Sequence, residues 1–235
     1  MVLTAIPVGF FAGLFGIGGG LISVPFLYYL FNSFGMDPNY VMHLAVGTSF
    51  SIIIPTSIVS VMTHHKFKAV DFDIVKSYGL FVVIGVIFGT IFAASIKTKP
   101  LVLFFSVVVF ILAFYLLYLK EKETNIKLTI KLSSKIFFGY SINNAIGSAA
   151  AIGFLIAVFG AGGFLISGSY LDVNMPLSIG FLNIPAFLIF IPITTFMARI
   201  GARTVHKIDK QRISKYFGFF LIVIGSKFLF EYFKL

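Results

Sequence analysis

The sequence contains no cysteine and very little charge. Without cysteine, disulfides, thiol catalysis and thiolate metal sites are excluded. Charged residues make up 11% of the 235 residues, whereas a soluble domain usually carries about 25%. Only eight residues are acidic, and none lies clearly in the middle of an apolar stretch. This absence argues against a cation transporter and against a proton relay or sodium site built on a buried carboxylate.

Apolar sequence, by contrast, is abundant. Hydrophobic residues make up 59% of the chain, and the mean hydropathy is +1.04. Seven apolar stretches approach or exceed the ~18 residues that cross a bilayer as a helix. They are Pro7–Leu30, Met42–Met62, Val75–Ser95, Leu101–Leu119, Ala145–Ser167, Leu177–Ile200 and Arg212–Tyr232. The sequence predicts an all-α polytopic membrane protein with about seven membrane segments. No lysine or arginine precedes the first stretch, which we therefore expect to be a retained segment rather than a cleaved signal.

The positive charge is concentrated in short connectors between the stretches. The connectors at 63–76, 120–136 and 199–212 are strongly basic, whereas those around Asp37 and Asp172 contain no cation. The positive-inside rule places the three basic connectors on the cytoplasmic side of the plasma (inner) membrane. The net charge of +10 therefore reflects topology, and we expect no nucleic-acid partner.

A short motif occurs twice. Residues 45–49 (AVGTS) return 100 residues later as residues 145–149 (AIGSA), and each copy opens an apolar stretch. Many secondary transporters are built from internal repeats, with the solute site where the two repeats meet. The duplication therefore predicts a small carrier.

The first apolar stretch is interrupted by glycine at positions 16 and 18–20. Each glycine in a helix costs roughly 1 kcal/mol relative to alanine, so the cluster needs a reason. One interpretation is small-residue pairs that let helices pack closely. We favour the other, in which the helix unwinds and a second half-helix begins near Leu21 with free N–H groups for an anion. Such arms could form a re-entrant hairpin.

Several motifs together resemble the sulfite exporter TauE/SafE family. They are Gly13–Gly20 with Val24-Pro25, the 45–49 motif, Asn144–Ala150, Ile179–Phe181, Ile184–Ala186, Gly201–Arg203 and His206-Lys207. The resemblance implies a membrane carrier for small, often sulfur-containing anions such as sulfite, thiosulfate and organosulfonates, usually assumed to be coupled to a proton or ion gradient.

One element of the family pattern is missing. Family members carry a second glycine-rich element before the second motif, but none occurs in Leu119–Asn144. We expect that about one helical hairpin is absent between Ile136 and Tyr140, because losing a hairpin, unlike losing a single span, leaves both flanking basic connectors on one side. The predicted parts of two inverted repeats are 1–119, a basic connector at 120–136, and 137–235 without its hairpin.

The predicted binding site gathers donors at membrane depth, because an anion that leaves water needs replacement hydrogen bonds. Its residues are Gly18, Gly19, Gly20, Leu21, Gly47, Thr48, Ser49, Gly147, Ser148 and Asn183. The alternative for each hydroxyl is a bond to a carbonyl one turn earlier or to a neighbouring helix. Asn183 is an amide well inside its predicted span and could face the site, with packing as the alternative.

A second group of residues could gate or couple transport. Pro55 and Pro185 interrupt apolar stretches and are either hinges or static kinks. His43 could titrate near neutral pH and couple protons, or be a boundary residue. Arg199 and Arg203 could attract an anion at the inner mouth, although topology alone explains them.

The favoured function is secondary transport, by alternating access, of a small anion towards the outside. The alternative is a non-transporting membrane scaffold or vestigial paralogue, which would pack the Thr48 and Ser148 regions solidly instead of leaving a donor-lined cavity. No nucleophile–base pair or metal-ligand set is visible, so we expect no enzyme activity, metal or cofactor. The expected partners are the small anion, the lipid bilayer and, with coupling, protons; the oligomeric state stays open.

Overall fold

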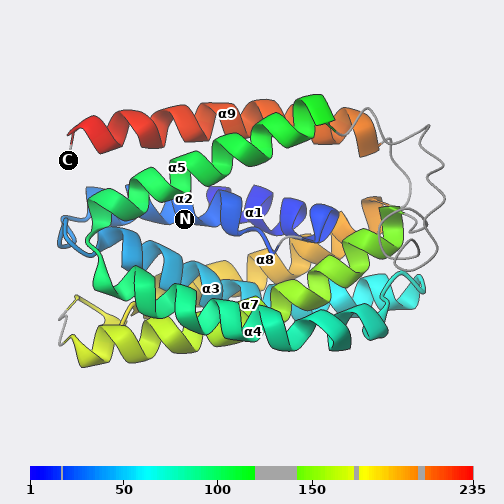
Figure 1. Cartoon of the computed structure of the whole chain (residues 1–235), viewed down its shortest axis with the longest axis horizontal. Helices are drawn as coiled ribbons and strands as arrows, with labels where there is room; N and C mark the ends of the chain where they lie inside the picture. Colours follow the sequence, from blue (N-terminus) through cyan, green and yellow to red (C-terminus); the bar gives the residue numbers. More distant parts are fainter. Residues whose placement is uncertain (17, 120–141, 172–174, 206–209, 235) are drawn as a thin grey trace.

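The computed structural model describes residues 1–235 except 17, 120–141, 172–174, 206–209 and 235. Its helices run roughly parallel to the long axis of the molecule, with α5 tilted (Figure 1). They are α1 (Val2–Phe15), α2 (Gly20–Ser33), α3 (Val41–Lys66), α4 (Phe72–Ser95), α5 (Thr98–Phe114) with the π-helical turn η1 (Tyr115–Leu119), α7 (Ile142–Tyr170), α8 (Ile184–Thr204) and α9 (Lys210–Lys234). Two short strands, β1 (Ser178–Ile179) and β2 (Leu182–Asn183), pair antiparallel between α7 and α8.

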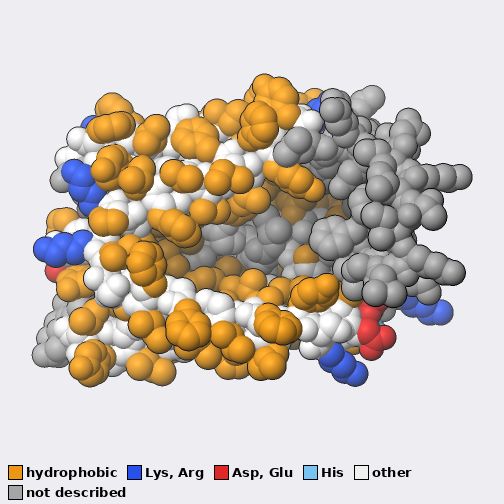
Figure 2. All heavy atoms as spheres, in the orientation of Figure 1, with side chains coloured by type: hydrophobic (Ala, Val, Ile, Leu, Met, Phe, Trp, Pro, Cys, Tyr) orange, Lys and Arg blue, Asp and Glu red, His pale blue; other side chains and the backbone are white. Residues whose placement is uncertain are grey.

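Among the described residues, six helices are long and apolar enough to cross a membrane. They contain the spans Val41–Lys66, Phe72–Ser95, Thr98–Tyr118, Asn144–Tyr170, Ile184–Thr204 and Ser214–Lys234. The visible face between the two ends is largely hydrophobic, and the charged side chains drawn there lie towards the ends (Figure 2). An apolar lateral surface is what contact with lipid tails requires. The predicted all-α polytopic membrane fold is confirmed.

The first apolar segment is broken, as the glycine cluster predicted. α1 ends at Phe15, α2 begins at Gly20, and the turn between them contains three glycines in the left-handed region. Their φ angles are 67° for Gly16, 69° for Gly18 and 82° for Gly19. A residue with a Cβ pays roughly 1–2 kcal/mol for this conformation, so glycine is needed at these positions.

Helices α3 and α8 run in the same direction. The backbone N–H of Asn183, just before α8, donates to Thr48 near the start of α3 at 2.9 Å. Further along both helices, the hydroxyls of Thr56 and Thr194 are 2.9 Å apart. The residue numbers of the contacting pairs rise together along both helices, so α3 and α8 are parallel. The directions of the two hairpin arms are described relative to this pair.

The first arm of the hairpin, α1, packs alongside α8. A Cβ built on Gly9 would stand 2.9 Å from Cβ of Met197, and Gly13 lies against the backbone of Ala198, which α1 can approach because glycine has no side chain. The contacts advance in the same order along both helices. α1 therefore runs parallel to α8 and to α3.

The second arm, α2, returns along α3. At its start Gly20 lies 3.4 Å from the side chain of Ile53, measured from a Cβ built on the glycine. One turn later the Ser23 hydroxyl contacts the hydroxyl of Ser49. The contacted residue on α3 moves from Ile53 back to Ser49 as α2 advances from Gly20 to Ser23, so α2 is antiparallel to α3 and to α1. The segment is therefore a hairpin of two antiparallel half-helices, which is the shape that the re-entrant interpretation predicted.

The six long helices alternate in direction. α3, α5 and α8 end, and α4, α7 and α9 begin, at one end of the molecule, which we call the basic end (right in Figure 1). The connectors at 63–76, 120–136 and 199–212 all attach to helices at this end. The connectors around Asp37 and Asp172 attach at the other. The three strongly basic connectors therefore join helices at one end, and the α4–α5 connector with Lys97 and Lys99 joins helices at the other; the cytoplasmic side stays a prediction.

The start of the sixth span differs from the prediction. The apolar stretch was expected to be helical from Leu177, but helix α8 begins at Ile184, after the β1–β2 turn. Gly180 and Leu177 have φ angles of 53° and 54° there, which a helix does not accommodate. Asn183 therefore caps the helix instead of lying inside a span, and Pro185 lies in the first helical turn, where proline is tolerated and does not interrupt the helix.

Candidate functional site

The first copy of the duplicated motif holds the start of α8. Gly47 lies against the backbone of Phe181, and a Cβ on this glycine would stand 3.1 Å from the Phe181 carbonyl carbon. The buried Thr48 hydroxyl accepts a hydrogen bond from the N–H of Asn183, two residues after Phe181, at 2.9 Å. The Asn183 side chain in turn accepts the N–H of Ala186 as the N-cap of α8. We call this contact the first docking site.

The second copy holds the start of α4 in the same way. Gly147 lies against the backbone of Ala69, and a Cβ there would stand 2.7 Å from the Ala69 carbonyl carbon. The buried Ser148 hydroxyl accepts the N–H of Asp71, again two residues further on, at 2.9 Å. Asp71 caps α4 by accepting from the N–H groups of Asp73 and Ile74. We call this contact the second docking site.

The two docking sites lie far apart and form no common pocket. Gly147 of the second site lies 3.3 Å, measured from a Cβ built on it, from Cβ of His64. His64 follows Thr48 by 16 residues on α3, which is about 24 Å along the helix. Both hydroxyls bind backbone groups, which is the solid packing that was expected of a scaffold. A donor-lined space has to be sought elsewhere.

The glycine turn of the hairpin lies between α3 and α7. Gly18 and Gly20 contact the side chain of Ile53 on α3, whereas Gly16 lies against the Ile146 carbonyl on α7. Gly20 and Leu21 are the first residues of α2, and their N–H groups have no carbonyl four residues earlier within that helix. Of the predicted site residues, the structure therefore groups Gly18, Gly19, Gly20 and Leu21 at one turn, with Gly19 as the N-cap of α2 facing α1.

Ser49 joins this turn. A Cβ built on Gly20 would stand 4.0 Å from the Ser49 hydroxyl oxygen, and the Ser49 hydroxyl contacts that of Ser23. Both serines are essentially fully buried. Hydroxyls that bond to each other can turn to donate to an incoming oxygen, so this pair adds donors beside the α2 N-terminus.

His43 packs in an aromatic cluster. Its side chain is fully buried, and Nε2 is 2.9 Å from the carbonyl oxygen of Ala93 on α4. The rings of Tyr40 and Phe181 lie 5.5 and 5.1 Å from the imidazole. A Nε2 that contacts a carbonyl carries the hydrogen, which fixes the tautomer. The geometry gives His43 a role in joining α3 to α4.

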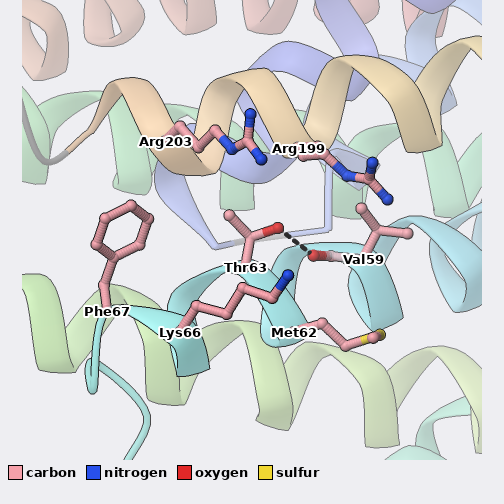
Figure 3. Close-up of a pocket in the computed structure, with 7 residues that line it drawn as sticks. All are labelled: Val59, Met62, Thr63, Lys66, Phe67, Arg199 and Arg203. Atoms are coloured by element: carbon pink, nitrogen blue, oxygen red, sulfur yellow. Dashed lines mark hydrogen bonds between the residues drawn. The ribbon is translucent and has the colours of Figure 1, made fainter.

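A pocket lined by three cations lies between α3 and α8 at the basic end. Its volume is about 220 Å³; Arg199 and Arg203 extend along α8 on one side, and Lys66 of α3 extends into the space between the two helices (Figure 3). The other lining residues are Val59, Met62, Thr63 and Phe67. None of the described residues that line it is acidic. We call this cavity the basic pocket.

The electrostatics of the basic pocket favour an anion. Three cations line one partly enclosed space, and all three side chains are exposed, so water and salt screen their mutual repulsion. A bound anion relieves this repulsion, and two guanidinium groups offer planar forks that fit oxyanions. The arrangement can therefore hold a small oxyanion.

Sequence reasoning found the two arginines but not Lys66, which it assigned to topology alone. Lys66 precedes Arg199 by 133 residues, and nothing in their spacing indicates that they meet. The neighbouring Thr63 was missed as well, although its spacing to Thr56 and Ser49 is regular. Pro55 lies inside α3, and Pro192 inside α8.

A second cavity is apolar. It has a volume of about 310 Å³ and lies between α3, α4 and α5, with Phe164 of α7 contributing to its wall. The space-filling view shows the face hollowed between α5 and α4 (Figure 2). Its other walls include Val46, Phe50, Gly89 and Phe104. A wall of this kind suits lipid chains rather than a hydrated anion.

Comparison with known proteins agrees with this architecture. The model of the family "Sulfite exporter TauE/SafE" matches residues 1–136 and 132–228. The two matches meet in the connector where a hairpin was expected to be missing; positions 136–140 lie outside the described residues, and the missing hairpin stays a prediction.

Curated relatives support the same class. A "Probable membrane transporter protein" of Haemophilus influenzae is 30% identical over 243 aligned residues, which cover 92% of each chain. A "Probable membrane transporter protein" of Bacillus subtilis is 26% identical, covering 98% of this chain and 97% of its own. No solved structure matches significantly. By the family match along nearly its whole length, the chain belongs to the sulfite exporter TauE/SafE family of membrane transporters.

Proposed function

We propose that the protein transports a small oxyanion by alternating access, with sulfite, thiosulfate or an organosulfonate as the best candidate, from the cytoplasm outwards. The observation that carries this proposal is the basic pocket, which Lys66, Arg199 and Arg203 line with no acidic residue among the described lining. The substrate class rests on the charge of the pocket, and the sulfur chemistry rests on the family.

The interior of the spans fits an anion better than a cation. Of the eight acidic residues, those within the long helices are Asp73 in the first turn of α4 and Glu231 near the end of α9. A cation carrier would need carboxylates at mid-membrane. The hairpin turn offers hydroxyls and helix N–H groups instead, so Gly18–Leu21 and Ser49 are proposed as the deeper part of the anion site.

The two docking sites support an arrangement in two inverted repeats, 1–119 and 137–235. The connector after α3 docks on α7, and the connector after α7 docks on α3, through equivalent residues at the same spacing. α3 and α7 run in opposite directions, as inverted repeats require. With the basic end in the cytoplasm, the basic pocket faces the cytosol, and outward transport begins there.

The test is flux measured in proteoliposomes of zwitterionic phosphatidylcholine, with sulfite and thiosulfate, with and without an imposed pH gradient. Arg203→Gln and Arg199→Gln are each expected to raise KM about tenfold, because one of the three cations that line the pocket is lost. Arg203→Lys should recover part of the loss. Lys76→Gln is the matched control, because Lys76 is an exposed cation near the same end but outside the pocket.

The outcomes separate the alternatives. No flux of any small anion by folded wild-type protein would favour the scaffold. Equal KM values for Arg203→Gln and Lys76→Gln would remove the pocket from the transport route. Substitution effects that appear only when anionic lipid is added would show that the cations bind lipid headgroups.

A further inference from the structure

Three buried hydroxyls form a row along α3. Ser49, Thr56 and Thr63 are spaced by seven residues, so successive members lie about 10.5 Å apart and within about 20° of the same face of the helix. Their side chains are 1%, 1% and 6% exposed. Each hydroxyl has a partner in this state: Ser49 contacts Ser23, Thr56 contacts Thr194, and Thr63 donates to the Val59 carbonyl at 2.7 Å (Figure 3).

The two ends of this hydroxyl row are the two parts of the proposed anion site. Ser49 lies beside Gly20 at the hairpin turn and contacts the hydroxyl of Ser23. Thr63 lines the basic pocket, together with Val59 one turn deeper. The row therefore runs about 21 Å, from the pocket at the basic end to the N-terminus of α2.

The middle of the row is closed by a contact between helices. The hydroxyls of Thr56 on α3 and Thr194 on α8 are 2.9 Å apart, and both residues are buried. Each hydroxyl also lies within hydrogen-bond distance of a carbonyl four residues earlier, Ile52 at 2.8 Å and Phe190 at 2.9 Å. The two hydroxyls have two hydrogens between them for these three acceptors, so both hydrogens are already used and neither threonine donates to a passing anion.

Both helices are weakened at this contact by proline. Pro55 immediately precedes Thr56 in α3, and Pro192 lies two residues before Thr194 in α8. A proline inside a helix has no N–H, so the carbonyl one turn earlier loses its helical donor and the helix bends there at lower cost. The place where the two helices touch is therefore also the place where each can bend.

We propose that the hydroxyl row of α3 is the route of the anion and that the Thr56–Thr194 pair is the gate between the basic pocket and the hairpin turn. This inference rests on the proposed transport function and names the residues that control it. In the closed state the two threonines bond to each other. When α3 and α8 separate at their prolines, the hydroxyls turn to donate to the anion and replace water along the route.

The first experiment measures accessibility and needs no substrate. The chain has no cysteine, so single variants Ser49→Cys and Thr63→Cys carry one thiol each. A membrane-impermeant methanethiosulfonate is added to sealed vesicles whose basic end faces the medium, with Lys68→Cys reporting the orientation. We expect Thr63→Cys to react at least about tenfold faster than Ser49→Cys, because the closed gate lies between them.

The second measurement weakens the gate without changing its shape. Thr56→Val, added to Ser49→Cys, removes one interhelical hydrogen bond, and the labelling rate of Ser49→Cys should rise about fivefold. The control is Thr195→Val. Thr195 neighbours Thr194, but its hydroxyl bonds only to carbonyls of its own helix, to Ile191 at 2.6 Å and Pro192 at 3.2 Å. This control should leave the rate unchanged.

The third measurement locks the gate. Hydroxyl oxygens 2.9 Å apart put thiols at the same positions within reach of a disulfide, so Thr56→Cys/Thr194→Cys should cross-link on oxidation with copper phenanthroline. Cross-linking should stop anion flux, and a reductant should restore it. Ser57→Cys/Thr195→Cys is the matched pair one residue along, which should neither cross-link nor lose flux.

These results separate the gate from the function. Equal labelling of Ser49→Cys and Thr63→Cys, or full flux through the cross-linked protein, would overturn the gate and leave transport intact. If wild-type protein carries no anion, the proposed function fails. The labelling ratio and its response to Thr56→Val still support or overturn a gated polar route between α3 and α8.

Discussion

The docking sites make a sharp prediction about glycine at position 147. In Gly147→Ala, the new Cβ would overlap the Ala69 carbonyl oxygen and stand 2.7 Å from its carbon, where ordinary contact begins at 3.4 Å. The Ala69 backbone must therefore move. Because Asp71 belongs to the same connector, its N–H is drawn away from the Ser148 hydroxyl, to which it now donates at 2.9 Å.

The magnitude follows from three effects. Alanine in place of glycine gains about 1 kcal/mol in helix propensity, overpacking costs about 1–3 kcal/mol, and the weakened hydrogen bond costs about 1 kcal/mol. The expected net loss is about 2 kcal/mol, which lowers the melting temperature by roughly 4–8 °C for a chain of this size. Gly85→Ala is the control, because a Cβ on Gly85 has no atom within 4 Å. It should keep or slightly raise the melting temperature.

The assay heats purified protein in detergent and measures the monodisperse fraction by size-exclusion chromatography. The reasoning is refuted if Gly147→Ala is as heat-resistant as Gly85→Ala, since the close approach of the 67–71 connector to α7 would then have no energetic consequence.

Two further predictions concern the same contacts. Asn183→Ala and Asp71→Ala each remove the N-cap of a spanning helix and should cost about 1 kcal/mol, seen in the same heating assay, whereas Asp71→Asn should retain most of the stability. Thr48→Val leaves the buried N–H of Asn183 without its acceptor and should cost about 1–3 kcal/mol, whereas Thr48→Ser keeps the acceptor; equal stability of the two variants would contradict the assigned bond.

The features that could be predicted from sequence are those that a motif or the charge of a connector indicates directly. The glycine turn was predictable because positive φ angles and an interrupted apolar stretch both demand glycine at 16, 18 and 19. The alternating directions of the spans were predictable because basic residues gather in every second connector. Each of these signals is contained within a few neighbouring residues.

The features that could not be predicted depend on contacts between distant residues. The partner of Ser148 is the backbone of Asp71, and a backbone N–H has no sequence signal. The sixth span was predicted to begin at Leu177 because the residues from Leu177 to Phe181 are largely apolar. The structure places these residues in the β1–β2 turn before α8. Lys66 and Arg199 line the same pocket because α3 and α8 are neighbours, and the spacing of these residues in the sequence does not indicate this.

The docking sites also give the proposed gate a direction. The first docking site fastens α8 to α3 at the end away from the basic pocket, through Thr48 and Asn183. Beyond the Thr56–Thr194 contact, residues of both helices line the basic pocket. A pair that is fastened at one end and bent at a proline opens at the other, so we expect α3 and α8 to part towards the basic end. α4 is held differently, because it contacts α7 at the basic end through Asp71 and Ser148 and contacts α3 at the opposite end through Ala93 and His43. The proposed opening therefore belongs to α3 and α8.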